Sequence, residues 1–213
     1  MQLWTLEQKA QVMEAIQVRH NRFGLSAGCN LLEFGNYETC TNGDDDNNGL
    51  WTSLVVAAES FRYAVTGAAD ARSNATSYFG GMQLLNLLTG IKGLMARSFV
   101  TPNETHSNDG TWHNSTVSGY EDWQWKGDTS SDEVAGHMFA YSILAKIMNG
   151  SSTETGQQAL DLISNIVYYI VSNDFYLIDV TGLPTSWGVW NPAQINLQRF
   201  WSDERFVIEF VSK

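Results

Sequence analysis

The sequence predicts a mainly all-α fold built from helical hairpins, with one small β-hairpin. Six segments carry apolar residues at helical spacing, and short and long connections alternate between them. One long connection contains two short apolar runs around a Gly-Pro turn, which is typical of a β-hairpin. A chain of 213 residues is long enough for one cored domain, so we expect residues 1–213 to form a single unit.

The six helical segments are distributed along the whole chain. Their expected bounds are 6–20, 50–65, 73–91, 131–148, 156–172 and, with a weaker pattern, 193–211. The segment at 131–148 is apolar almost all round, so we expect it to be buried. Three hairpins of this kind bury their inner faces poorly, so we expect either self-association or a missing C-terminal half. A compact six-helix domain that closes on itself is the alternative.

The long connections are expected to gather on one face of the domain. They cover residues 21–49, 92–130 and 173–192, whereas the links at 66–72 and 149–155 are short. Helices that alternate in direction place alternate loops at opposite ends. Long loops on a rigid scaffold usually carry function, so this face is the expected site. The β-hairpin lies in the third loop, where FYLIDV and TSWGVW flank the turn 181–184.

The net charge excludes some classes of binding partner, and the cysteines bear on the cellular compartment. A formal net charge of −11, with no basic stripe, makes nucleic acid and anionic membranes poor partners, and no apolar run is long enough to span a bilayer. In an oxidising compartment Cys29 and Cys40 would close their polar loop with a disulfide; in the cytosol they would be free thiols. N-x-[ST] sequons start at Asn74, Asn103, Asn114 and Asn149. Together these features favour an extracellular, secreted protein.

The stretch GDDDNNGLWT is the first candidate site. Asp44, Asp46 and Asn48 fit the first half of an EF-hand loop, so weak Ca²⁺ binding is one interpretation, although Val55 stands where the bidentate Glu would be. This interpretation would make the domain calcium-stabilised and structural. Otherwise we expect no cofactor. The alternative is an acidic helix entry, in which Asp and Asn cap the first turn and Trp51 lies at its mouth.

The stretch YEDWQWKGDTSSDEVAGH is the densest cluster of titratable and aromatic groups. Asp128 and Asp132 lie at a helix entry, and Glu133 and His137 share one helix face because they are four residues apart. A His beside a carboxylate can donate or accept a proton. Part of the pattern is simply a capping box from Ser130 to Glu133. The alternative for the His is a core residue satisfied by Glu133.

Aromatic and basic side chains around these groups would hold a ligand. The candidates for substrate contact are Trp51, Trp123, Trp125, Trp187, Trp190 and Arg97. Trp187 and Trp190 are three apart on a strand and so do not share a side, which leaves at most one of them as a platform. Sugars have apolar faces and hydroxyls, and their sites pair aromatic surfaces with carboxylates. Hydrolysis usually needs two carboxyls. Asp128, Asp132 or Glu133 would supply the acid, and Asp45 or Asp46 would be its partner.

The chain resembles the six-hairpin, or α/α toroid, glycan-processing proteins. DNNGLWT, GDTSSDEVAGH and LIDVTGLPTSWGVWNP carry the resemblance, each beside a predicted inner helix. It implies an incomplete α/α toroid and a glycan ligand at the long-loop face. We therefore expect an extracellular, glycoside hydrolase-like protein with paired carboxylates in a Trp-lined cleft. Elimination through His137, Tyr120 and Arg97 ranks lower because the chain is acidic. The competing hypothesis is a non-catalytic secreted module that binds glycans or assembles with itself.

Overall fold

The computed structural model describes residues 4–149 and 152–197. It is 51% helical and 15% strand, with six helices and four small sheets in the described residues. The prediction of an all-α fold is therefore wrong: the fold is mixed, although helices make up its larger part. The missed strands lie in the first two long loops and are only two or three residues long, which is too short for an alternating pattern to be visible.

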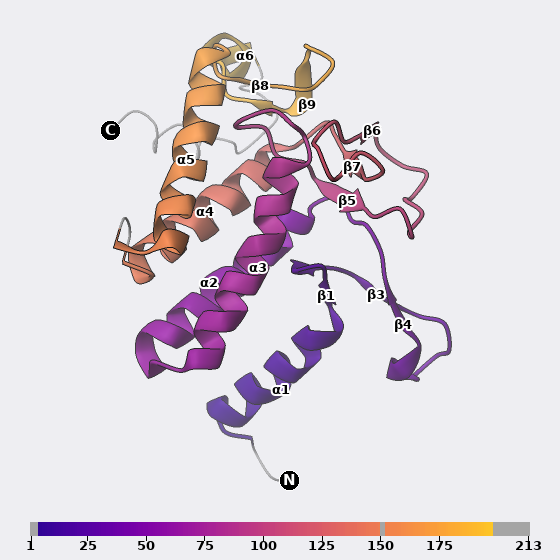
Figure 1. Ribbon diagram of the computed structural model, residues 1–213, viewed down its shortest axis with the longest axis vertical. Helices are drawn as coiled ribbons and strands as arrows, with labels where there is room; N and C mark the ends of the chain where they lie inside the picture. Colours follow the sequence, from indigo (N-terminus) through magenta and orange to yellow (C-terminus); the bar gives the residue numbers. More distant parts are fainter. Residues whose placement is uncertain (1–3, 150–151, 198–213) are drawn as a thin grey trace.

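The helices lie close to their expected positions (Figure 1). They are α1 (Leu6–Arg19), α2 (Asn48–Thr66), α3 (Ala69–Leu87), α4 (Ser131–Ile147), α5 (Glu154–Ser172) and α6 (Pro192–Leu197). Gly67 ends α2 in the left-handed conformation at φ 67°, which costs glycine little, and α3 starts two residues later. The expected sixth helix continues to residue 211, and its part beyond residue 197 lies outside the described residues.

Each strand pairs only with strands of its own long loop. They are β1 (Asn21–Arg22), β2 (Leu25–Ser26), β3 (Cys29–Leu31), β4 (Cys40–Asn42), β5 (Ser98–Val100), β6 (Trp112–Asn114), β7 (Gln124–Lys126), β8 (Tyr176–Ile178) and β9 (Pro184–Val189). The sheets are β1-β2, β3-β4, β5-β7-β6 and β8-β9, all antiparallel. β8-β9 is the predicted β-hairpin. A disulfide joins Cys29 to Cys40 across β3 and β4.

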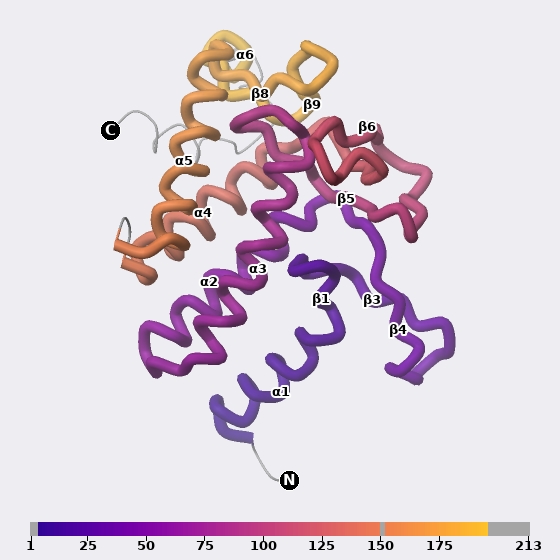
Figure 2. Tube along the Cα trace, viewed as in Figure 1, coloured from indigo at the N-terminus to yellow at the C-terminus, as the bar shows by residue number. Residues whose placement is uncertain are grey.

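Two layers of helices form the core (Figure 2). α2 and α4 pack side by side, α3 packs against α2, and α5 packs against α4. Both α2–α3 and α4–α5 are hairpins with short links, as predicted. Phe79, Met82, Tyr141 and Leu144 are among the fully buried side chains between these helices. The layers place the N-terminal ends of α2 and α4 together, because Ser130 Oγ lies 3.2 Å from Asn47 Oδ1.

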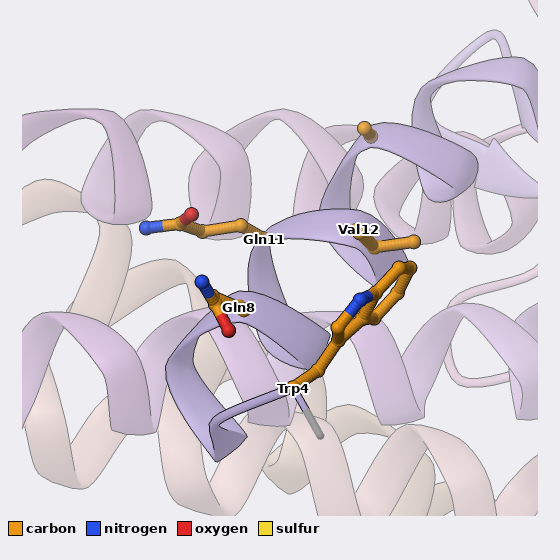
Figure 3. A pocket seen from close by; sticks show the side chains of 5 residues that line it. Trp4, Gln8, Gln11 and Val12 are labelled. Atoms are coloured by element: carbon orange, nitrogen blue, oxygen red, sulfur yellow. The ribbon is translucent and has the colours of Figure 1, made fainter. Parts of the chain in front are cut away.

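α1 lies at the edge of this arrangement (Figure 1). Its capping box is formed by Thr5 and Gln8, and none of its residues is buried. A salt bridge of 3.2 Å from Glu14 to Arg62 ties it to α2. A shallow hollow on α1 is lined by Trp4, Gln8, Gln11, Val12 and Ala15, and four of these are labelled in Figure 3.

Candidate functional site

The three long loops meet at the N-terminal ends of α2 and α4, as the alternating connections predict. The first loop contacts the second where Asp44 accepts hydrogen bonds from the backbone N–H and the hydroxyl of Ser107. The second contacts the third where Asp128 N–H donates to Asp179 Oδ2 at 2.9 Å. Five charged residues gather there, and we call them the loop-face cluster: Asp46, Arg97, Asp109, Lys126 and Asp128.

Lys126 lies at the centre of the loop-face cluster. Its side chain is only 2% exposed, and its Nζ lies 2.6 Å from Asp46 Oδ1 and 3.1 Å from Asp109 Oδ1. Burial opposes the charge on Lys126, but the hydrogen bonds to both carboxylates outweigh it, so the pKa of Lys126 is raised. The hydrogen bonds from Ser107 and Lys126 lower the pKa of Asp109. Lys126 is therefore a charged anchor for two loops.

Arg97 joins two of the carboxylate residues that the sequence singled out. Its Nε donates to the backbone carbonyl of Asp46 at 2.6 Å, and its Nη1 donates to that of Asp128 at 3.2 Å. Asp46 and Asp128 therefore flank one guanidinium, although they are far apart in the sequence. Because Arg97 binds their backbone carbonyls, it fixes the two residues without neutralising both side chains.

Asp128 is held in an uncommon backbone conformation next to the β-hairpin. Its φ is 51°, in the left-handed region that Asp tolerates better than most residues. Its Oδ1 accepts a hydrogen bond of 2.6 Å from the backbone N–H of Ser186 on β9. The next residue, Trp187, is 63% exposed. An exposed indole therefore follows by one residue the backbone N–H that positions this carboxylate.

The other tryptophans named from the sequence divide into surface and core. Trp51 is exposed in the first turn of α2. Trp125 is buried, and Trp123 packs against Phe99 with ring centroids 5.4 Å apart. Trp190 is half-buried against the core, so only one of Trp187 and Trp190 is an exposed surface. Trp123, Trp125 and Trp190 therefore support the loops from beneath.

Glu133 and His137 lie below the surface, between α2 and α4. Both side chains are fully buried, and Glu133 Oε2 lies 3.4 Å from His137 Nδ1. Nδ1 is also 2.8 Å from the backbone carbonyl of Glu133. Burial raises the pKa of Glu133 well above its ordinary value and lowers the pKa of His137 to about 4. Burial therefore favours the neutral form of both groups, and neither has a surface that a ligand can touch. Asp132, by contrast, is exposed in the first turn of α4.

The three residues of the half EF-hand pattern point to different partners. Asp44 binds Ser107, Asp46 binds Lys126, and Asn48 Oδ1 accepts a hydrogen bond of 2.6 Å from Ser98 Oγ. Across residues 4–149 and 152–197, no group of three His, Cys, Asp or Glu side chains is arranged to hold a metal ion. The helix-entry alternative is also not borne out in its capping, because the N-cap residue Asn47 makes no side-chain capping bond and the first turn of α2 contains no acid.

Sequence reasoning missed Lys126, Asp109 and Asp179 as members of this site. Lysine is seldom buried, so nothing in WQWKGD indicates that Lys126 is enclosed. Asp109 and Asp179 act through partners 17 and 51 residues away, and such pairs leave no local pattern.

A second groove, lined by Gln83, Asn86 and Lys92 among others, lies between α3 and α5, away from the loop face.

Comparison with protein-family models, with curated proteins and with solved structures finds no significant match to this chain. Within the described part of the chain, no helix is long and apolar enough to cross a membrane. The assignment of a function therefore rests on the geometry of the loop face.

Proposed function

We propose that the chain is an extracellular glycan-binding domain whose ligand lies on the loop face, across Trp187 and the loop-face cluster. The observation that carries the proposal is the exposed indole of Trp187 directly beyond the Ser186–Asp128 hydrogen bond. An indole offers a flat apolar surface to a sugar ring. The Asp128 carboxylate and the Arg97 guanidinium lie on the same face and can hydrogen-bond to hydroxyls.

The disulfide and the sequons support an extracellular location. A disulfide between Cys29 and Cys40 is stable in oxidising compartments. Asn74, Asn103, Asn114 and Asn149 are all exposed, so each sequon is accessible to glycosylation. Expression through a eukaryotic secretory pathway should give a chain whose mass falls on treatment with peptide-N-glycosidase. A secreted chain with no such shift would remove this support.

Binding is favoured over cleavage because the acid with a raised pKa is inaccessible. A glycosidase needs a protonated carboxyl beside the scissile bond. Burial raises the pKa of Glu133, but this side chain is enclosed between α2 and α4. Hydrolysis remains the second candidate because Asp46 and Asp128 flank Arg97, which brings two carboxylate residues to one place.

The test is affinity electrophoresis through gels that contain soluble β-glucan, xylan or mannan, with heparin as the anionic comparison. We expect a neutral polysaccharide to retard the chain and Trp187→Ala to abolish the retardation. Trp4→Ala is the matched control, because Trp4 is 55% exposed but lies just before α1, outside the loop face. Equal retardation of both variants, or no retardation by any of the three neutral polysaccharides, would count against the proposal.

The same polysaccharides distinguish binding from hydrolysis. Release of reducing ends that is lost in both Asp128→Asn and Asp46→Asn would replace the binding proposal with the second candidate. If Asp128→Asn weakens retardation and the wild-type chain releases no reducing ends, the binding proposal is supported.

A further inference from the structure

α2 exposes a continuous apolar row on the side away from the core. Its members are Trp51, Leu54, Ala58, Phe61 and Val65, all of them exposed. Leu54 and Phe61 are each 52% exposed. The row advances by three and four residues in turn, which is the a/d spacing of a helix that packs along a partner helix. The opposite side of α2, which includes Val56 and Ala57, is buried. α2 is therefore apolar on two sides, and within residues 4–149 and 152–197 only one of these sides is covered.

α4 exposes a second row with the same spacing. Its members are Asp132, Ala135, Phe139, Ser142 and Lys146. Phe139 is 46% exposed and lies seven residues from the acid at one end and seven from the base at the other. The row is therefore arranged symmetrically about Phe139, with opposite charges at its two ends.

The two rows lie on one face. α3 covers one side of α2, α5 covers the corresponding side of α4, and α2 and α4 pack side by side. They also run in roughly the same direction, because their N-terminal ends meet (Figure 1). The sides turned away from α3 and α5 therefore form a common surface, which we call the α2–α4 face.

We infer that the α2–α4 face pairs with the same face of a second copy of this chain, related by a two-fold axis that makes the facing helices antiparallel. With the axis at Phe139, Asp132 of one copy faces Lys146 of the other, and the symmetry repeats this contact. Leu50 contacts Gly136, so Leu54 lies at about the level of Phe139. The large Trp51 then faces the small Ala58 of the second copy.

The charge pattern selects a second copy over an unrelated partner. A row with an acid and a base at equal distances from its centre complements itself when it is reversed. Antiparallel packing also makes the dipoles of the facing helices point in opposite directions, which favours the pairing. Trp51, Leu54 and Phe139 are each about half exposed and lie at the centre of this pairing, where the second copy would cover their apolar surface.

The test is sedimentation velocity of the full chain from about 1 to 100 µM, a range that covers interfaces of modest affinity. We expect a dimer that dissociates on dilution. Leu54→Glu and Phe139→Glu should each raise the dissociation constant more than about tenfold, because they bury an unpaired charge. Leu160→Glu is the matched control, because Leu160 is an exposed leucine on α5. Circular dichroism melting verifies that each variant is folded.

A charge exchange tests the orientation of the two copies. Lys146→Asp alone sets two acids against each other and should weaken the dimer, whereas Asp132→Lys combined with Lys146→Asp should restore it. A wild-type chain that is monomeric up to 100 µM would overturn the inference. So would a dimer that Leu160→Glu weakens as much as Leu54→Glu does. A double charge variant that dimerises no better than the single one would overturn the antiparallel arrangement.

Discussion

Glu133 of α4 accepts a hydrogen bond of 3.0 Å from the backbone N–H of Gly49, in the first turn of α2. The N-cap residue of α2, Asn47, makes no side-chain capping bond, so a side chain from the neighbouring helix takes over this function. Ser130 Oγ accepts from Glu133 N–H at 3.3 Å, which is one half of the predicted capping box. The other half is absent between these two residues because the Glu133 carboxyl is engaged by α2.

Removal of the Glu133 side chain should destabilise the fold more than its conversion to an amide. Glu133→Ala leaves buried N–H groups at the start of α2 without an acceptor, at a cost of about 1–3 kcal/mol each. Glu133→Gln keeps an oxygen in place and should lie within about 1 kcal/mol of the wild type. Urea unfolding followed by circular dichroism measures both. Equal loss in the two variants would mean that the oxygen does not act as a cap.

Glu133 and His137 should have opposite effects on the pH dependence of stability. The folded pKa of Glu133 is raised, so its contribution is present below its ordinary value of 4.5 and is lost as pH rises above it. The folded pKa of His137 is about 4 against an ordinary 6.5, so stability rises between pH 4 and 6.5. Because the two slopes oppose each other, the stability of the wild type should change less above pH 4.5 than that of a variant that keeps only one of the two groups.

Glu133→Gln separates the two slopes. In this variant His137 is the only member of the pair that still titrates. The free energy of unfolding should then rise by about 3 kcal/mol from pH 4 to 6.5. His137→Gln should instead show a decline above pH 4.5. Urea unfolding at half-unit pH intervals gives both profiles. A Glu133→Gln profile parallel to that of the wild type would show that the carboxyl ionises in the folded chain as it does in the unfolded one.

The helical part of the fold was predictable because each long helix has its own run of apolar residues at helical spacing. α4 and α5 match their expected bounds to within two residues. The strands in the first two loops are only two or three residues long, and their positions also depend on side-chain contacts with distant residues. Arg22, for example, is held by Phe99 O at 2.7 Å and by Glu104. β1 has only two residues, which is too short a segment for a pattern that indicates a strand or its contacts. An all-α fold was therefore predicted.

The site was predictable in its parts but not in their grouping. Asp46, Arg97 and Asp128 were named from the sequence and lie together because Arg97 binds two backbone carbonyls. Glu133 and His137 were placed with Asp128 because they are close in sequence. A helix that starts at the loop face carries its later residues into the core, however, and whether residue 133 is inside or outside depends on where α2 packs.

Gly49 should be among the positions of α2 least tolerant of substitution. A Cβ added there would lie far inside the van der Waals radius of Glu133 Oε2 and of the His137 ring. Gly49→Ala should therefore cost at least about 1–3 kcal/mol through overpacking. Gly80→Ala in α3 is the matched control, because its Cβ meets nothing within 4 Å and should gain up to about 1 kcal/mol of helix propensity. Similar unfolding free energies for the two variants would contradict the close approach of α2 and α4.

Reduction of the Cys29–Cys40 disulfide should loosen its own hairpin without unfolding the domain. β3 and β4 contribute no buried residue, and neither does the turn that joins them, so the core does not depend on this hairpin. The crosslink mainly limits the freedom of the loop that it closes. Hydrogen exchange with and without dithiothreitol should show faster exchange at residues 29–42 and unchanged protection in α3 and α4. A double Cys29→Ser/Cys40→Ser variant should behave like the reduced chain, and a loss of protection in α4 in either sample would contradict this independence.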